Sequence, residues 1–269
     1  MRITSIGIIT ESVIMKTSFT TMATPELSVT RQFEEAKRYG FHGVDLRMIE
    51  RGMGEISRSM TQEEAQTLRS QMQGVEVPVL MCYNEKIQAG REGMETSLLE
   101  HMKIASLLGI PAIRIFTGLI QDQQDQNLLV EVLRNVLKND RTGTAIAMQN
   151  HINCSVTLHQ GLDICKAIED PRVSLIFSPD HALLLQESYE EMLPELAKYS
   201  SQLYVADMGQ DHKTVLPGQG IIPYTRILRE LCRHGFDGYV TLKWERCWHP
   251  ELAPYGEAFD AFLDWHRSV

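Results

Sequence analysis

The stretch LGIPAIRIFTG, residues 108–118, contains the transition that decides the fold. A helical pattern over 94–108 ends at Gly109, and glycine is the residue that most readily takes the left-handed conformation after a helix. A run rich in apolar side chains follows at once, which is typical of a buried strand. Gly40 and Gly235 are placed in the same way, each between a helical pattern and an apolar run. The order helix, glycine, strand therefore recurs along the chain.

The whole chain alternates between short apolar runs and amphipathic stretches. The predicted strands are 3–9, 43–49, 75–83, 112–118, 144–150, 173–178, 202–207 and 238–244. The predicted helices are 26–39, 61–73, 94–108, 123–138, 157–168, 188–199, 222–234 and 255–267, with Thr61 and Glu64 as a capping box for the second. Such an alternation over roughly 250 residues predicts a (β/α)8 TIM barrel, α/β in class, as a single domain over residues 1–269. An open doubly wound sheet is the alternative, but the glycine-rich first turn that it usually has does not follow 3–9.

Composition and charge exclude several classes of protein. Apolar residues make up 43% and charged residues 23% of the chain, which are ordinary values for a chain with a sizeable core. No apolar run is long enough for a membrane span, and MRITSIGIITESVIMK lacks the layout of a signal peptide. The net charge of −9, without a stripe of Lys and Arg, argues against nucleic acid. Five cysteines without a CxxC pair indicate reduced thiols, so we expect a cytoplasmic protein with a small-molecule ligand.

The carboxyl ends of the barrel strands are where function is expected, because active sites of such barrels lie at that face. Side chains alternate along a strand, so parity selects the inward set. In TAIAMQN the large apolar side chains face the helices, which leaves Gln149 inward. The same parity selects Ser178, Tyr204 and Lys243 in the strands that follow. Lys243 is therefore predicted to point into the barrel mouth although it ends an apolar strand.

Several motifs resemble one known family. They are GFHGVDLR (40–47), LGIPAIRIFTG (108–118), AIAMQNH (145–151), FSPDH (177–181), YVADMG…LPGQG (204–220) and GYVTLKWERCWHPEL (238–252). The chain resembles the xylose-isomerase-like barrel superfamily over essentially its whole length, and within it the sugar phosphate isomerase/epimerase group. The resemblance implies the same barrel, a carbohydrate-type ligand, and a homodimer or tetramer.

The resemblance also implies a divalent metal, held by Glu, Asp, His and Glu at four strand ends. In this chain the four positions carry Gln149, Ser178, Tyr204 and Lys243, the residues that parity selects. A hard divalent cation binds anionic oxygens or imidazole. Three of the four side chains are neutral and the fourth is a cation that repels a metal. We therefore expect no metal at the family position, no cofactor, and no reaction by the family's metal-assisted route.

Other residues near the predicted mouth are candidates for contacts with a substrate. They are His151, Arg47, Arg114, Glu245, Trp244 and His212. Arg47 and Arg114 can pair with a carboxylate or phosphate, although an ion pair inside the barrel with Asp45 or Glu245 is the favoured interpretation. Trp244 either stacks on a sugar face or packs within its loop, and the second is favoured.

A second set of residues allows a different metal site. Asp180, His181, Asp207 and His212 can form a relocated cluster, but hydrogen-bonded loop residues are the favoured interpretation because the spacing is not specific. His181 can also bind a substrate or transfer a proton.

Two functional hypotheses from different classes follow. In the first, the chain is a metal-independent isomerase, epimerase or lyase acting on a sugar, polyol or keto-sugar acid. Lys243, with its pKa lowered by burial, acts as a base or Schiff-base nucleophile, or it serves as a fixed positive charge, with Tyr204 and His181 as proton donors. In the second, the chain is a catalytically inactive paralogue that serves as a carbohydrate-binding or regulatory subunit. A metal-dependent isomerase that uses the relocated cluster is a further alternative.

Overall fold

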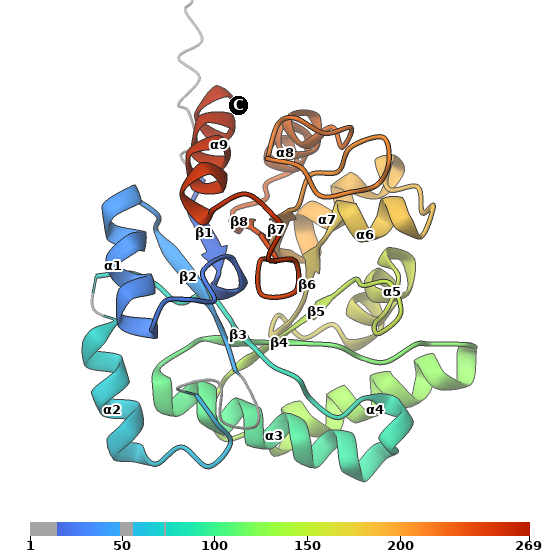
Figure 1. Cartoon of the computed structure of the whole chain (residues 1–269). Helices are drawn as coiled ribbons and strands as arrows, with labels where there is room; N and C mark the ends of the chain where they lie inside the picture. Colours follow the sequence, from blue (N-terminus) through green and yellow to red (C-terminus); the bar gives the residue numbers. More distant parts are fainter. Residues whose placement is uncertain (1–14, 49–55, 73) are drawn as a thin grey trace, which may run out of the picture.

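The computed structural model describes residues 15–48, 56–72 and 74–269. Its strands pair in parallel in the order β1 to β8, and β8 pairs with β1, which closes the sheet into a barrel. The strands are β1 (Thr17–Thr20), β2 (Gly43–Arg47), β3 (Leu80–Met81), β4 (Ala112–Ile115), β5 (Ala145–Gln149), β6 (Val173–Phe177), β7 (Ser200–Val205) and β8 (Tyr239–Leu242). Figure 1 shows the strands at the centre of the molecule, with the helices around them. The predicted (β/α)8 barrel is confirmed.

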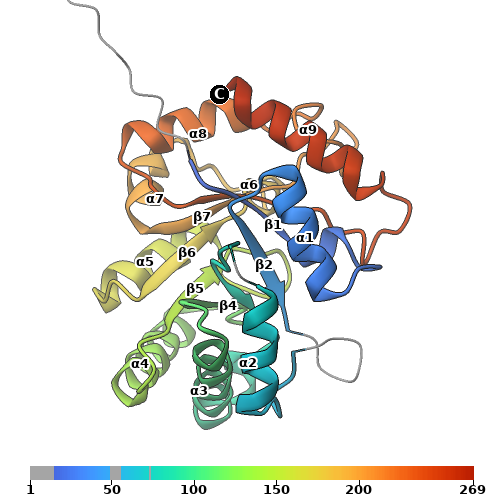
Figure 2. The same cartoon turned by 90° about the vertical axis from the view of Figure 1, so that its left-hand side faces the viewer.

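The helices form the outer layer of the barrel. They are α1 (Val29–Tyr39), α2 (Gln62–Gln71), α3 (Arg91–Leu108), α4 (Gln123–Asn139), α5 (Leu158–Ile168), α6 (Pro179–Leu184), α7 (Leu193–Tyr199), α8 (Tyr224–Arg233) and α9 (Tyr255–Ser268), with short 3-10 turns η1 (Thr21–Ala23), η2 (Ile87–Ala89) and η3 (Glu190–Met192). Figures 1 and 2 both show α8 beside α9, where the Trp265 indole donates a hydrogen bond to Thr225 Oγ1 over 3.0 Å. In the described ranges, no helix is long and apolar enough to cross a membrane.

The predicted helix boundaries agree with the local chemistry. Gly40 and Gly109 end α1 and α3 in the left-handed conformation, with φ of 79° and 71°, which a residue without a Cβ adopts at little cost. Thr61 and Glu64 form the predicted capping box at the start of α2. These residues fix where the helices begin and end, and they therefore limit where the neighbouring strands can begin.

The first strand differs from the prediction. Residues 3–9 lie outside the described residues, and the first strand of the barrel is β1, Thr17–Thr20. The sequence TSFT is not an apolar run. Its inward side chain is Ser18, which bonds to Asp45 Oδ1 over 3.1 Å and to Thr241 Oγ1 over 2.7 Å. A strand whose inward face is polar escapes a search for apolar runs.

The segment after β6 also differs from the prediction. The short helix α6 follows Ser178 directly and was not predicted, because six residues show too little periodicity. The predicted helix 188–199 is divided into η3 and α7. Helix α6 matters for function because it carries Asp180 and His181 at the carboxyl end of the barrel.

The strands divide their side chains between two cores, as parity predicts. The outward residues of β5 to β8 join the large core between barrel and helices; among them are Met148, Leu175, Leu203 and Leu242. Ala147, Ile176 and Tyr204 form a separate cluster inside the barrel. The inward orientation of the strand-end residues therefore follows from the burial of the outward ones.

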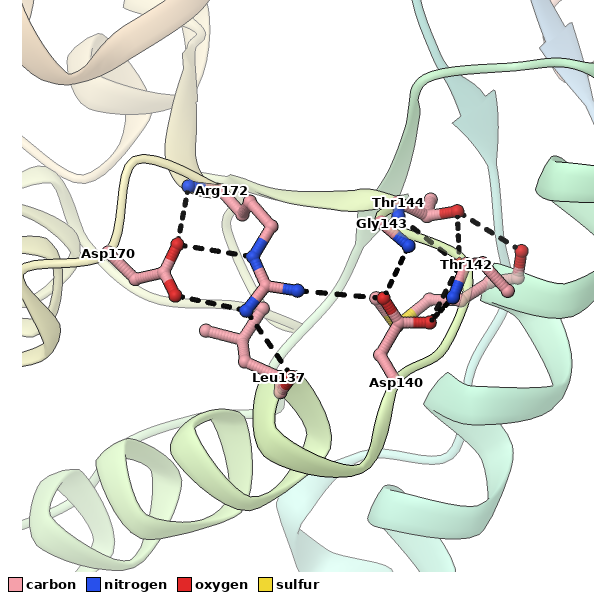
Figure 3. Close-up of polar contacts among 8 residues, drawn as sticks. Leu137, Asp140, Thr142, Gly143, Thr144, Asp170 and Arg172 are labelled. Atoms are coloured by element: carbon pink, nitrogen blue, oxygen red, sulfur yellow. Dashed lines mark hydrogen bonds and ion pairs between the residues drawn. The ribbon is translucent and has the colours of Figure 1, made fainter.

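A polar cluster at the other end of the barrel joins the loops before β5 and β6. Asp140 accepts hydrogen bonds from the backbone N–H groups of Thr142 and Gly143, each over 2.9 Å, and its side chain is 2% exposed. Arg172 bonds to Asp170 over 3.1 Å and lies 3.6 Å from Asp140, as Figure 3 shows. Asp140 thus sets the turn that brings Thr144 and β5 into register.

Replacing Asp140 with alanine should reduce the free energy of unfolding by about 2–3 kcal/mol, because buried hydrogen bonds to a charged acceptor are lost. Urea denaturation of Asp140→Ala measures this change. The matched control is Asp264→Ala, which removes an exposed partner of Arg267 and should have little effect. Equal stability of the two variants would contradict the assigned role of Asp140.

Candidate functional site

The carboxyl ends of β5 to β8 carry four polar side chains that point into the barrel. Gln149 ends β5, Ser178 follows β6, Tyr204 lies in β7 and Lys243 follows β8. Each of these four strand-end residues is at most 3% exposed. The cluster of Tyr204 with Ala147 and Ile176 inside the barrel agrees with the predicted inward orientation, and burial requires that each polar group have a partner.

Lys243 is held by a buried ion pair with a residue of α6. Its Nζ donates a hydrogen bond to Asp180 Oδ2 over 2.6 Å and another to His181 Nε2 over 2.9 Å. The Glu245 carboxylate lies 3.6 Å from the same nitrogen. Both partners of the ion pair are nearly inaccessible, with side chains 2% and 1% exposed.

The charge state of Lys243 differs from the prediction. Burial by itself lowers the pKa of the ammonium, but the negative charges of Asp180 and Glu245 offset it, and the pKa of Lys243 is raised above 10.5. The expected lowering of this pKa is wrong, because the sequence does not show that α6 places a carboxylate against Nζ. With its pKa raised, the ammonium is protonated near pH 7, and the role that this arrangement favours is a fixed positive charge.

Two imidazoles beside this ion pair are neutral near pH 7. Burial, and then the charge of Lys243, lower the pKa of His181 far below its usual range and that of His151 to about 4. The rings are in contact, with centroids 3.8 Å apart. An ammonium has no lone pair, so His181 Nε2 accepts and the proton of the neutral ring is on Nδ1. Among the described residues, this buried Nδ1 has no hydrogen-bond partner.

Tyr204 belongs to a second network that is centred on Asp45. The Tyr204 hydroxyl donates to Asp45 Oδ2 over 3.0 Å, and Ser18 and Gln202 donate to Oδ1 over 3.1 and 3.2 Å. Burial raises the pKa of Asp45 to about 7, although these hydrogen bonds and the charge of Arg114 lower it. Burial also raises the pKa of Tyr204 well above its usual value. The predicted role of Tyr204 as a proton donor to substrate is not supported, since its fully buried proton is directed at Asp45.

Gln149 and Ser178 form a hydrogen bond with each other, which links the carboxyl ends of β5 and β6. Gln149 Nε2 donates to Ser178 Oγ over 3.2 Å. Asn150 reinforces the link, because it accepts from the Ser178 backbone N–H over 2.7 Å and donates to the Ser178 carbonyl over 2.9 Å. These two strand ends therefore form a structural bridge.

The strand-end residues do not suit the divalent metal that the resemblance implies. The available groups are an amide, a hydroxyl, a phenol that stays protonated and an ammonium, and none supplies the anionic oxygen that a hard cation requires. The Asp180 and Glu245 carboxylates lie 2.6 and 3.6 Å from the Lys243 ammonium, which balances their charge and repels a metal cation.

The relocated cluster is not assembled either. Asp207 accepts backbone N–H groups from Met208, Gly218 and Gly220, which makes it the anchor of the loop after β7. His212 is exposed in a turn of that loop, at a positive φ of 59°. Within the described part of the chain, no group of three or more His, Cys, Asp and Glu side chains is arranged to hold a metal ion.

The remaining predicted residues are placed as follows. Trp244 is 1% exposed in the core between barrel and helices, and its indole donates to the Ala253 carbonyl over 3.0 Å. Of the two interpretations of Trp244, packing within the protein fits this placement, because Trp244 has the opposite parity to Lys243. Arg47 and Arg114 point inward at the mouth, but within the described residues neither forms the expected ion pair with Asp45 or Glu245.

A cavity of about 600 Å³ lies at the opposite, amino-terminal end of the barrel. The first residues of three strands, Ala112, Ala145 and Tyr239, are among those that line it. The charged groups converge instead at the mouth, the end of such barrels at which active sites lie.

Comparison with known proteins agrees with this architecture. The sequence profile of the xylose isomerase-like TIM barrel family matches residues 33–266, so the chain belongs to that family. No curated protein matches the sequence significantly.

Solved structures share the fold at low sequence identity. D-psicose 3-epimerase from Clostridium cellulolyticum H10 has a TM-score of 0.75 at 16% identity, over 95% of this chain and 99% of that one. A protein named IOLI, crystallised with a bound zinc atom, has a TM-score of 0.74 at 19% identity, over 92% and 95%. The probable 3-DHS dehydratase AsbF from Bacillus anthracis has a TM-score of 0.73 at 16% identity, over 93% and 99%.

Removing only one partner of the buried ion pair should be costly. Lys243→Met leaves the Asp180 carboxylate buried without a cation, and we expect a loss of about 3–5 kcal/mol in the free energy of unfolding. The double variant Lys243→Met/Asp180→Asn should recover most of this loss, because neither of the two fully buried charges remains and Glu245 is partly exposed. Lys166→Met, which removes a partner of Glu195 at the surface, is the control. Denaturant titration that finds the double variant no more stable than the single one would count against the ion pair.

Asp45 should make stability depend on pH. Its folded pKa of about 7 lies above the ordinary value of 3.8, so its contribution to stability is complete below about pH 4 and is lost as the pH rises through 7. The shift corresponds to about 4 kcal/mol at most. Asp45→Asn should therefore be more stable than the wild type at about pH 8, and the difference should vanish near pH 4. Thermal melts across this range, with exposed Asp260→Asn as the control, test the sign. A difference that does not change with pH would show that Asp45 is charged throughout.

Proposed function

We propose that this protein is a metal-independent enzyme that isomerises, epimerises or dehydrates a carbonyl-containing sugar or keto-sugar acid. The observation that carries the proposal is the buried, charged Lys243 at the strand end, in contact with neutral His181. The similar structures named as an epimerase and a dehydratase support this class of chemistry by fold alone.

The chemistry shared by these reactions is removal of a proton from the carbon next to a carbonyl. The electron pair moves onto the carbonyl oxygen, and a fixed positive charge stabilises the enolate that forms. Lys243 supplies this charge, and His181 Nδ1–H is a donor without a protein partner in the described residues. Glu245 is 29% exposed beside Nζ and is placed to accept the proton. Return of the proton from Glu245 to a neighbouring carbon gives an isomer, and delivery of a proton from solvent to the other face gives an epimer. Departure of a β-hydroxyl as water, with the proton that Glu245 accepted, gives dehydration.

A second candidate is a non-catalytic carbohydrate-binding or regulatory subunit. The specific observation in its favour is that the polar groups of the strand-end residues already have hydrogen-bond partners within the protein. Gln149 bonds to Ser178, and Tyr204 bonds to Asp45. The charge of Lys243 is matched by Asp180 as well. A ligand-binding protein needs only the accessible groups at the mouth.

Deuterium exchange separates these two functions. The protein is treated with a chelator, transferred to D2O and incubated with panels of sugars and keto-sugar acids, and NMR follows deuterium incorporation at the carbon next to the carbonyl. We expect exchange by the wild type without added metal and a loss of at least about 100-fold in Lys243→Met/Asp180→Asn, since a fixed charge next to an oxyanion contributes about 3 kcal/mol. Lys166→Met is again the control. Activity that requires stoichiometric Mn²⁺, Mg²⁺ or Zn²⁺ would overturn the proposal, and ligand binding without exchange would favour the second candidate.

A further inference from the structure

Two inward arginines lie in one layer of the barrel on the side of β2, β3 and β4. Arg47 of β2 is the register partner of Met81 in β3, and Met81 is the partner of Arg114 in β4. Neighbouring strands are about 4.8 Å apart, so the two arginine backbones are separated by about 10 Å. The two guanidinium groups therefore start from one level and point to the same part of the mouth.

Aromatic rings fix the orientation of both guanidinium groups. Tyr83, two residues after Met81, has its ring centroid 5.5 Å from Cζ of Arg47 and 5.5 Å from Cζ of Arg114. Arg47 also contacts the ring of Trp248 at 4.8 Å, and Arg114 contacts Phe116 at 4.1 Å. Each Cζ lies over its rings, and these cation–π contacts supply no conventional hydrogen-bond acceptor to the N–H groups. The hydrogen-bonding edges of both groups remain to be satisfied.

These edges are largely unused by the described part of the protein. Arg114 is only 2% exposed, yet its one side-chain hydrogen bond is from Nη1 to the Cys82 carbonyl over 3.3 Å. Nε of Arg114 and Nε of Arg47 are both buried without a hydrogen-bond partner among these residues. A buried donor that lacks a partner costs free energy, so a ligand that supplies acceptors is favoured at this position.

The charge on this side of the mouth is also unbalanced. Lys243 is paired with Asp180 and lies near Glu245, whereas no ion pair to Arg47 or Arg114 is present in the described ranges. Asp45 is within the field of Arg114 but is occupied by Tyr204, Ser18 and Gln202. The part of the mouth formed by β2, β3 and β4 therefore carries two cations, and no carboxylate among the described residues is paired with either of them.

We propose that Arg47 and Arg114 bind an anionic oxygen group, a carboxylate or a phosphoryl group, at one end of the substrate. Both groups present coplanar or clustered acceptor oxygens that match the N–H bonds of guanidinium. The substrate class narrows from sugars in general to sugar acids or sugar phosphates. Trp248, 58% exposed and stacked on Arg47, forms the outer wall of this site.

This inference rests on the proposed function for the orientation of the substrate, with its anionic end at Arg114 and its carbonyl carbon towards Lys243. Anion binding itself does not require turnover, so a binding measurement tests it separately. An absence of deuterium exchange would remove the proposed reaction and leave the anion site in place.

The experiment is calorimetric titration of the chelator-treated, full-length protein with matched probes. D-gluconate represents the carboxylates, D-glucose 6-phosphate the phosphates, and D-glucose and D-sorbitol the neutral compounds, with inorganic phosphate as the anion alone. We expect at least one anionic series to bind about 10-fold or more tightly than the neutral probes, because a charge-assisted hydrogen bond contributes at least this factor. The series that binds identifies the anion as carboxylate or phosphoryl.

Variants assign the effect to the two arginines. Arg114→Met and Arg47→Met should each weaken binding of the preferred anion about 10- to 100-fold and leave binding of neutral probes unchanged. Arg114→Lys should recover part of the loss, since it keeps the charge and loses the two-pronged geometry. Arg229→Met, an exposed arginine of α8, is the matched control. Absence of binding by both anionic series, equal binding of anionic and neutral probes, or unchanged affinity in Arg114→Met and Arg47→Met would each overturn the proposal.

Discussion

The buried ion pair between Lys243 and Asp180 is the interaction on which the arrangement of the mouth depends. An ammonium and a carboxylate with almost no exposure are stable only when they compensate each other, since the desolvation cost of either alone is several kcal/mol. The pair fixes α6 against the end of β8 and places His181 against Nζ. It also contributes to the charge states of its neighbours. Burial and then the ammonium lower the pKa values of His151 and His181, while Asp180 and Glu245 offset the effect of burial on the pKa of Lys243.

The mouth contains cations with two different electrostatic roles. Lys243 has matched counter-charges and cannot move without breaking them, which suits a group that must hold a constant field. Arg47 and Arg114 stack on aromatic rings and have donors without partners among the described residues, which suits groups that bind a ligand. Between them, Asp45 is buried at the barrel axis with a pKa of about 7. The chain thus belongs to the xylose isomerase-like TIM barrel family while its strand ends have a chemistry unlike that of a metal site.

Parity in the strands was enough to predict much of this arrangement from the sequence. The alternation of large apolar residues in β5 to β8 correctly identified Gln149, Ser178, Tyr204 and Lys243 as inward. The predictions that failed depend on tertiary contacts. The pKa of Lys243 depends on Asp180, which is distant in sequence and reaches Nζ through a helix too short to predict. Trp244 is adjacent to Lys243 in sequence but faces the opposite side of the sheet. For Asp45, the sequence predicts only an ion pair with an arginine, although Asp45 shares the inward parity of Arg47.

The protonated ammonium of Lys243 occupies the strand end where the resemblance implies a metal ligand. The most direct test is ¹⁵N NMR of the lysine Nζ groups, with the Lys243 signal assigned by Lys243→Met/Asp180→Asn, across a titration from neutral to alkaline pH. We expect the Lys243 Nζ to keep the ¹⁵N chemical shift of a protonated, slowly exchanging ammonium above pH 10.5, the ordinary pKa of lysine. Asp180→Asn should lower the pKa of Lys243. Deprotonation of Lys243 at or below the ordinary lysine pKa in the wild type would contradict the account.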